Sequence, residues 1–169
     1  RLGWIRAQRG DLPGAASRFE EVLAAHPDDP AAHEGLGVTL EWMGDDDTAA
    51  EHYARALEGD RHARYALHRL GWIRASHPRS ELRDAGEAVR LAELAASDSR
   101  GSEASELDLL AAAYAEAARF DEAVQIAERA RQNARDADYA AAIERRLELY
   151  RKSLPYRRPA TLRQGGGGE

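Results

Sequence analysis

Apolar side chains recur along the chain at intervals of three and four residues, the spacing of one face of an α-helix. Two stretches with this spacing are Ala15, Phe19, Val22 and Leu23, and then Ala49, Tyr53, Ala56 and Leu57. Turns rich in Gly, Pro and Asp separate such stretches. Asp29-Pro30 combines an N-cap residue with a proline suited to the first helical turn, and Asp45 can cap the next helix. The pattern predicts short amphipathic helices joined by tight turns.

The heptapeptide Arg-Leu-Gly-Trp-Ile-Arg-Ala occurs twice, at residues 1–7 and 69–75. The offset of 68 residues is two periods of 34, and Leu36-Gly37 stands in phase halfway between the copies. A fixed period of this length is typical of stacked helix–turn–helix repeats. The sequence therefore predicts an all-α, right-handed superhelical solenoid of about four repeats with a C-terminal capping helix.

The repeats are expected at about 1–29, 30–60, 61–101 and 102–135, followed by the capping helix at 136–152 and a basic, Pro/Gly-rich tail at 153–169. Residues 1–152 thus form one predicted repeat domain. The period slips in the third repeat, because Leu110 follows Leu70 by 40 residues. We assign five of the six extra residues to the turn at 76–82 and one to the loop at 97–103. Ala118 stands where a turn glycine is expected.

The repeat resembles the tetratricopeptide repeat (TPR), whose pattern is W-x2-L-G-x2-Y, then A-x3-F, then P. The matching residues are Leu2-Gly3, Leu36-Gly37 and Leu70-Gly71 for L-G, Ala15/Phe19 and Ala49/Tyr53 for A-x3-F, and Pro27. The glycine is expected where the two helices of a repeat cross closely. Departures are Arg6 and Arg74 at the Tyr position, His33 and Leu67 at the Trp position, Arg61 at the Pro position, and Leu110-Ala111 in place of L-G.

The second half resembles, more narrowly, a C-terminal TPR module of large bacterial multi-domain proteins. The residues that carry this likeness are Leu70 to Ile73, Pro78, Leu82 to Asp84, Glu87 to Glu93, Leu107-Asp108, Ala111 to Tyr114, Leu149 to Arg151 and Pro155 to Arg157. The resemblance implies that the lengthened turn is a trait of the module. Because the chain starts at Arg1 inside a helical pattern, we expect a fragment of a longer protein.

Composition narrows the functional classes. The 169 residues include no cysteine, which removes disulfides and thiolate metal sites, and no apolar run is long enough to span a membrane. The net charge of −6 is uneven, since residues 143–163 carry +5 and residues 1–142 carry −10. An acidic body with a basic end argues against a broad nucleic-acid surface. The compartment stays open, with the cytoplasm slightly favoured for a soluble fragment.

Stacked TPR hairpins place the first helix of each repeat on the concave face, which is where the resemblance implies a partner-binding groove. The candidate groove residues are Trp4, Glu34, Val38, Glu41, Trp42, Tyr65, His68, Arg69, Trp72, Asp108, Ala112 and Glu116. Large aromatic side chains beside charges are typical interface anchors. The alternative for each tryptophan is packing between neighbouring repeats.

Signals for other chemistry are incomplete. TPR domains that clamp a C-terminal carboxylate use Asn where this chain has Trp4 and Val38, so no clamp is expected. His33-Glu34 begins like a zinc-protease motif, but Gly37 replaces the second histidine, and no two of the six histidines lie four residues apart. We therefore expect no catalysis and no cofactor or metal.

The leading hypothesis is a non-catalytic scaffold that binds a protein, as a peptide or helix, in the groove. One alternative is a regulatory or substrate-presenting appendage of an upstream enzymatic domain. Another is self-association through the N-terminal end or the tail. The basic end is expected to be a solvated cap. The alternative is contact of Arg145, Arg146, Arg157, Arg158 and Arg163 with phosphate, anionic lipid or an acidic protein, and the tail is a candidate for docking on a TPR surface.

Overall fold

The computed structural model describes residues 10–98 and 103–159. These residues form eight α-helices and one 3-10 turn, without a strand among them. They divide into two compact units, residues 10–66 (unit 1) and the described residues from 67 to 159 (unit 2), and the boundary lies inside α5 (Arg64–Ser76). The predicted helix at 1–9 lies outside the described residues.

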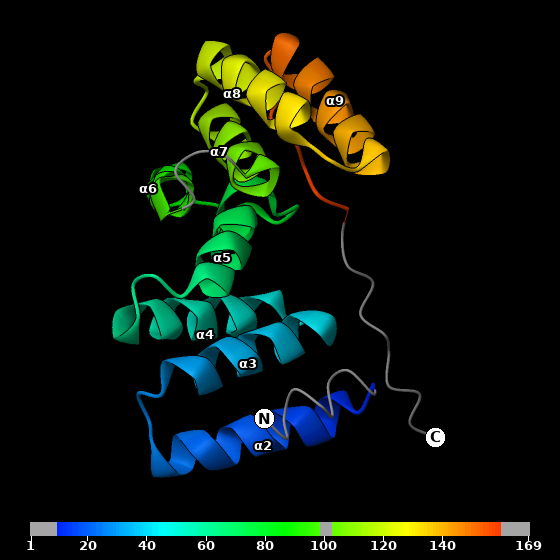
Figure 1. Ribbon diagram of the computed structural model, residues 1–169. Coiled ribbons are helices and arrows are strands. Elements are labelled where there is room, and N and C mark those ends of the chain that lie inside the picture. Colours follow the sequence, from blue (N-terminus) through cyan, green and yellow to red (C-terminus); the bar gives the residue numbers. More distant parts are fainter. Residues whose placement is uncertain (1–9, 99–102, 160–169) are drawn as a thin grey trace. The chain divides into compact units, whose positions relative to one another are not determined.

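Unit 1 contains α2 (Leu12–Ala25), α3 (Pro30–Trp42) and α4 (Asp46–Gly59), which pack in chain order (Figure 1). Aspartates begin all three helices: the carboxylates of Asp11, Asp29 and Asp45 accept hydrogen bonds from backbone N–H groups three residues on, at 3.0, 2.8 and 3.4 Å. Gly44 ends the α3 turn with φ 81°. The predicted caps at Asp29 and Asp45 are confirmed.

Close helix crossings in unit 1 depend on glycines in α3. A Cβ at Gly37 would lie 2.9 Å from the ring of Tyr53 on α4, the second helix of the same repeat. The Tyr53 side chain is fully buried, and its hydroxyl donates a 2.9 Å hydrogen bond to Glu41. The role expected for the L-G glycine is therefore confirmed at this repeat.

Unit 2 contains the rest of α5, then α6 (Ala85–Asp98), α7 (Ala104–Glu116), α8 (Phe120–Asn133) and α9 (Ala137–Arg151). Alanines on α6 and α8 pack against leucines and alanines of α7, and α9 covers α8 with Ile143, Leu147 and Tyr150. Here the L-G glycine serves a different contact, because a Cβ at Gly71 would lie 2.9 Å from Leu109 on α7. Ala118 holds the expected turn position with φ 59°, a conformation that favours glycine.

The lengthened turn between α5 and α6 contains a 3-10 turn at Ser80–Leu82 and is held by two arginines. Arg74, at the position that the TPR pattern gives to Tyr, forms a 2.6 Å ion pair with Glu87 and donates a 3.1 Å hydrogen bond to the Leu82 carbonyl. Arg83 donates to the His77 carbonyl at 2.9 Å and reaches Glu116 on α7. Arg74, which replaces the tyrosine of the TPR pattern, therefore has a structural role: it holds the inserted turn in place.

Candidate partner-binding site

A buried ion pair between α7 and α9 forms the base of the site in unit 2. The Arg146 guanidinium donates to both carboxylate oxygens of Asp108, at 2.9 and 2.5 Å, and the Tyr139 hydroxyl adds a third hydrogen bond at 2.9 Å. Burial raises the pKa of Asp108, and Arg146 opposes that shift. Burial lowers the pKa of Arg146, but the charge and hydrogen bonds of Asp108 and the nearby tyrosines together raise it, and the net shift is upward. The pair fixes the guanidinium in place.

Two aromatic rings lie beside this guanidinium. The Arg146 Cζ atom is 5.6 Å from the ring centre of Trp72 on α5 and 5.5 Å from that of Tyr156, which follows α9. The two rings meet edge to face, with centroids 6.2 Å apart and planes at 87°. Cation–π and edge-to-face contacts both favour this arrangement. Trp72, Arg146 and Tyr156 thus form one stacked cluster.

The histidine next to Trp72 is held in its neutral form. The Trp72 indole N–H donates to His68 Nε2 at 3.3 Å, which requires an unprotonated Nε2. Burial lowers the pKa of His68, in agreement with that tautomer. His68 therefore supports the tryptophan ring as a neutral acceptor.

Residues 153–159, which we call the C-terminal segment, turn back onto unit 2 (red in Figure 1). The turn begins at Ser153, whose φ is 54°. The Arg158 N–H donates to the Ser76 carbonyl at 2.9 Å, and Arg157 forms a 2.6 Å ion pair with Glu116. Docking of the tail on a TPR surface, one of the sequence-based candidates, is thus seen for Tyr156 to Arg158. The polyglycine stretch lies outside the described residues.

Between this segment and the helices lies a cavity of about 350 Å³, which we call the unit 2 cavity. Its walls come from α5, α7, α9 and the C-terminal segment, and its lining residues are His68, Arg69, Trp72, Asp108, Tyr139, Arg146, Tyr156 and Arg158. Four of these were predicted groove residues from two different repeats. Sequence reasoning missed Tyr139 and Tyr156 as members of the site, because no local pattern indicates that α9 and the tail close its open side.

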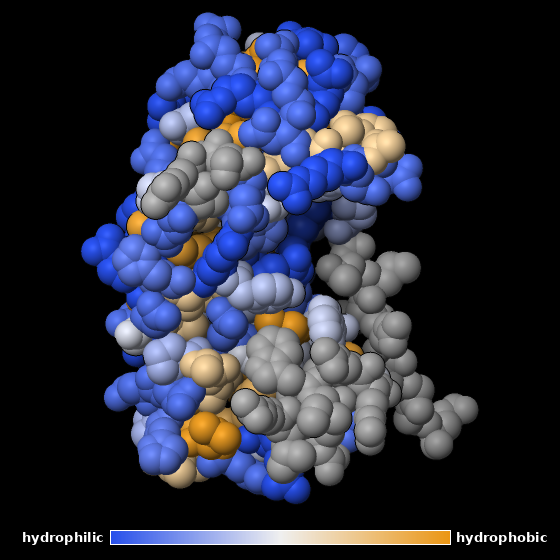
Figure 2. Space-filling view, viewed as in Figure 1, coloured by the Kyte–Doolittle hydropathy of each residue, from blue (hydrophilic) through white to orange (hydrophobic). Residues whose placement is uncertain are grey.

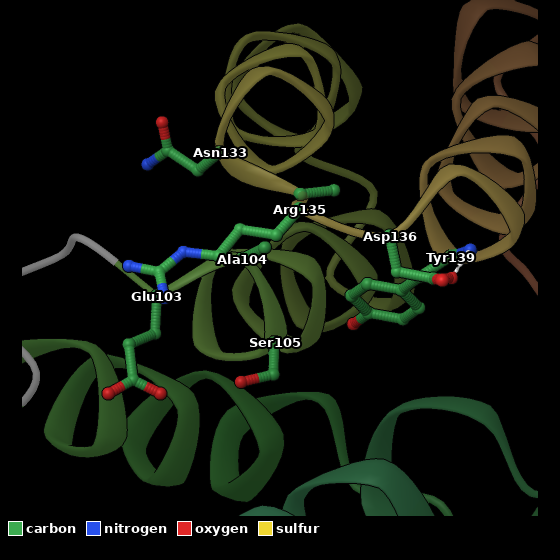
Figure 3. A pocket seen from close by; sticks show the side chains of 8 residues that line it. Glu103, Ala104, Ser105, Asn133, Arg135, Asp136 and Tyr139 are labelled. Carbon is green, nitrogen blue, oxygen red and sulfur yellow. Dashed lines mark hydrogen bonds between the residues drawn. The ribbon is translucent and has the colours of Figure 1, made fainter.

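A second cavity in unit 2, of about 560 Å³, shares Tyr139 with the first, and Figure 3 shows side chains that line it. It is lined by the start of α7, including Glu103 and Ser105, and by the connection from α8 to α9, including Arg135. The Asp136 carboxylate accepts a 2.7 Å hydrogen bond from the Tyr139 N–H and caps α9. Tyr139 thus lines both cavities, while its hydroxyl is committed to Asp108.

Unit 1 holds two of its predicted groove residues in one cavity of about 610 Å³, formed by the turns before α3 and α5. Glu34 lies there, half-buried, and its carboxylate accepts a 3.1 Å hydrogen bond from the Ala66 N–H. Burial raises the pKa of Glu34. Tyr65 lines the same cavity and is 44% exposed, whereas Trp42 is 46% exposed at the end of α3.

Four predicted groove residues need correction. Val38, Glu41, Asp108 and Ala112 are exposed by 1, 6, 0 and 2%, so they present almost no surface to a partner. The physical reason is that α3 and α7 are packed on several sides at once. Two of the four are polar and find partners inside the protein, Glu41 in Tyr53 and Asp108 in Arg146. Glu116 and Trp72 remain partly exposed, and Trp4 lies outside the described residues.

The basic residues near the C-terminal end form more ion pairs with the rest of the protein than a solvated cap would. Arg146 and Arg157 form ion pairs with Asp108 and Glu116, and Arg151 bridges Glu128 and Glu144. Arg163 lies outside the described residues. The face of the molecule shown in Figure 2 is largely hydrophilic, with only small hydrophobic patches. No helix in the described parts of the chain is long and apolar enough to cross a membrane.

Two histidines that are far apart in sequence meet across the α3–α4 hairpin. His33 Nε2 lies 2.8 Å from the Pro27 carbonyl oxygen and therefore carries a proton, so its Nδ1 accepts from His52 Nδ1 at 2.9 Å. The i,i+4 rule applied to the sequence does not detect this pair, because the two residues lie on different helices. Within 10–98 and 103–159, no group of three or more metal-binding side chains comes together.

This pair predicts a pH effect on stability. Burial, followed by the nearby His33, lowers the pKa of His52 in the folded chain. The unfolded chain therefore binds more protons once the pH falls below about 6.5, and the free energy of unfolding decreases there. Urea unfolding followed by tryptophan fluorescence on either side of that pH measures the decrease. The His52→Gln variant keeps a donor for His33 and should lose part of the pH dependence. An identical dependence in both proteins would contradict the prediction.

The class of protein follows from this geometry: helix hairpins with a 34-residue period, one of which crosses closely at Gly37, define an all-α helical-repeat fold of the TPR type. Residues 1–65 match the family model of the tetratricopeptide repeat. The likeness to the tetratricopeptide repeat in this comparison is thus confined to the first 65 residues of the chain. No curated protein sequence matches it closely enough to count as a relative.

Solved structures show the same fold over most of the chain. PilF of Pseudomonas aeruginosa superposes with a TM-score of 0.69 at 22% identity, covering 89% of this chain and 66% of PilF. The chain thus spans slightly less than two thirds of that protein. A MamA RS-1 double mutant and MamA from residue 41 to its end, from Desulfovibrio magneticus RS-1, each give a TM-score of 0.68 at 16% identity, covering 90% of this chain and 92% of MamA.

Proposed function

We propose that this chain is a non-catalytic protein–protein interaction scaffold that holds a peptide on the first-helix face of its repeats, with the unit 2 cavity as the principal site. The TPR fold typically serves protein–protein interaction, and this supports the general class. The observation that carries the finer proposal is the C-terminal segment itself. A stretch of chain without regular secondary structure already lies on α5 and α7, held by an edge-to-face ring contact, an ion pair and a main-chain hydrogen bond.

The chemistry of the site suits a peptide better than a reaction. Trp72 provides a large ring that is only partly buried, and such residues are typical anchors at interfaces. The titratable groups around it are already engaged, Asp108 with Arg146 and His68 with the indole N–H. Asp108 is a buried carboxylate that accepts two hydrogen bonds from one guanidinium. Such a pair holds the two helices together and is poorly placed to transfer protons.

A library of random linear peptides selected on the intact chain and on its Tyr156→Ala variant tests this function. We expect recovered peptides to lose binding to Trp72→Leu and to keep it with Trp42→Leu, a matched control at an exposed tryptophan in unit 1. Circular dichroism establishes that each variant is folded. Peptides that bind Trp72→Leu as well as the parent, or no recovered peptide on either chain, would contradict the proposed site.

A further inference from the structure

We propose that the surface formed by Trp72, Arg146 and Glu116 beside the unit 2 cavity recognises peptides in which an aromatic residue is directly followed by arginine. The chain's own Tyr156-Arg157 covers this surface until such a partner displaces it. This inference rests on the proposed function, because it names the partner chemistry and the regulation of the same site. The evidence is the set of contacts that the C-terminal segment makes with α5, α7 and α9.

The aromatic half of the recognition is prepared by the helices. Tyr156 meets the Trp72 ring edge to face and lies 5.5 Å from the Arg146 guanidinium. Asp108 holds that guanidinium through two hydrogen bonds, so its position is fixed by helices α7 and α9. Any flat aromatic side chain gains from this combination of ring edge and cation, whereas an aliphatic side chain does not.

The arginine half is prepared by Glu116, at the end of α7. One carboxylate oxygen of Glu116 accepts from Arg83 at 2.9 Å, which anchors the carboxylate to the inserted turn. The other oxygen lies 2.6 Å from Arg157. The Glu116 side chain is only 11% exposed, so it faces the segment from a partly desolvated position where a cation is favoured. The adjacent side chains of Tyr156 and Arg157 thus contact two separate parts of this surface, one at Trp72 and one at Glu116.

The contacts of the segment are individually modest, which makes it displaceable. The Arg157 side chain is 35% exposed in its ion pair, so water screens the attraction between the two charges and weakens it. The segment follows directly after α9, so its short tether gives it an effective concentration on the order of millimolar. A partner with the same two side chains and further contacts elsewhere on the surface competes with it.

A labelled peptide with the sequence of residues 153–159, Ser-Leu-Pro-Tyr-Arg-Arg-Pro, is the probe, and fluorescence anisotropy is the measurement. The intact 169-residue chain should bind it weakly. The Tyr156→Ala/Arg157→Glu chain, in which the segment is released, should bind it about tenfold more tightly, because the tethered competitor is gone. Arg157→Gln, which removes only a half-exposed ion pair, should fall between the two, and Lys152→Ala, an exposed neighbour, should match the parent.

Several results would overturn the inference. One is equal binding of the probe to the parent, Arg157→Gln and the released chain. Another is binding of a control peptide, with Ala for the tyrosine and Glu for the first arginine, as tightly as the probe. A dimer of the intact chain in light scattering that Arg157→Glu abolishes would assign the segment to a second copy instead. Peptides selected from the random library that depend on Trp72 but do not compete with the probe would leave the proposed function standing and reject this inference alone.

Discussion

Replacement of Arg146 by alanine is expected to lower the free energy of unfolding by about 3–5 kcal/mol, the usual cost of leaving one partner of a buried ion pair alone. The Asp108 side chain is 1% exposed and that of Arg146 12%, so water cannot replace the lost guanidinium. The substitution also removes the cation that packs against Trp72 and Tyr156. Chemical denaturation followed by tryptophan fluorescence measures the loss.

Two further variants separate charge from packing at this position. Arg145→Ala changes the exposed neighbour on α9 and should alter stability by no more than about 0.5 kcal/mol. The double variant Asp108→Leu/Arg146→Met removes both charges while keeping apolar volume, and it should recover most of the loss. If Arg146→Ala costs no more than Arg145→Ala, the ion pair with Asp108 does not stabilise unit 2.

Gly35→Val is expected to destabilise unit 1 by about 3 kcal/mol, at the upper end of the usual cost of overpacking a well-packed core. A Cβ at Gly35 would lie 2.3 Å from Cε1 of Phe19 on α2. The Phe19 ring is itself buried with Ala16, Ala32 and Leu36, so it cannot swing away without disturbing the α2–α3 contact. Thermal and urea unfolding of the variant measure this cost.

Ala31→Val is the control for the effect of valine on the helix backbone. Ala31 is an exposed residue on the same helix, so only the lower helix propensity of valine acts there. Phe19→Leu should restore part of the stability in the Gly35→Val background, because the smaller side chain makes room for the added methyl groups. A loss at Gly35 no larger than the loss at Ala31 would show that α2 moves freely on α3.

Much of the fold could be predicted from the sequence. The 34-residue period, the aspartate caps and the prolines in first helical turns are local signals, and the helices begin where these signals place them. The position of the inserted turn could also be predicted, since alanine spacing in the second helices locates it. The spacing does not show which part of the inserted turn becomes a 3-10 turn. It also does not show that Arg74 and Arg83 hold this turn in place through ion pairs with Glu87 and Glu116.

The candidate site was predicted only in part. Four residues that were predicted from their place on first helices, His68, Arg69, Trp72 and Asp108, line one cavity, and their binding of a partner stays a prediction. The same rule placed Val38 and Ala112 in a groove although both are buried, because a repeat pattern assigns a face to each residue but does not show how closely the neighbouring helices cover that face. Tyr139, Arg146 and Tyr156 reach the site from α9 and the C-terminal segment, which the repeat pattern does not include.

By itself, the sequence determined the helical-repeat architecture, because amphipathic spacing, caps and turn residues act between neighbours a few residues apart. The repeated heptapeptide at 69–75 also predicted that Trp72 lies on the first helix of a repeat, and it lies on α5. Only the tertiary structure decided what surrounds that tryptophan. Arg146 lies beside it because Asp108 holds the guanidinium across two helices, and Tyr156 lies beside it because the chain turns back after α9. These contacts join residues distant in sequence, so their energies depend on helix packing and leave no local pattern.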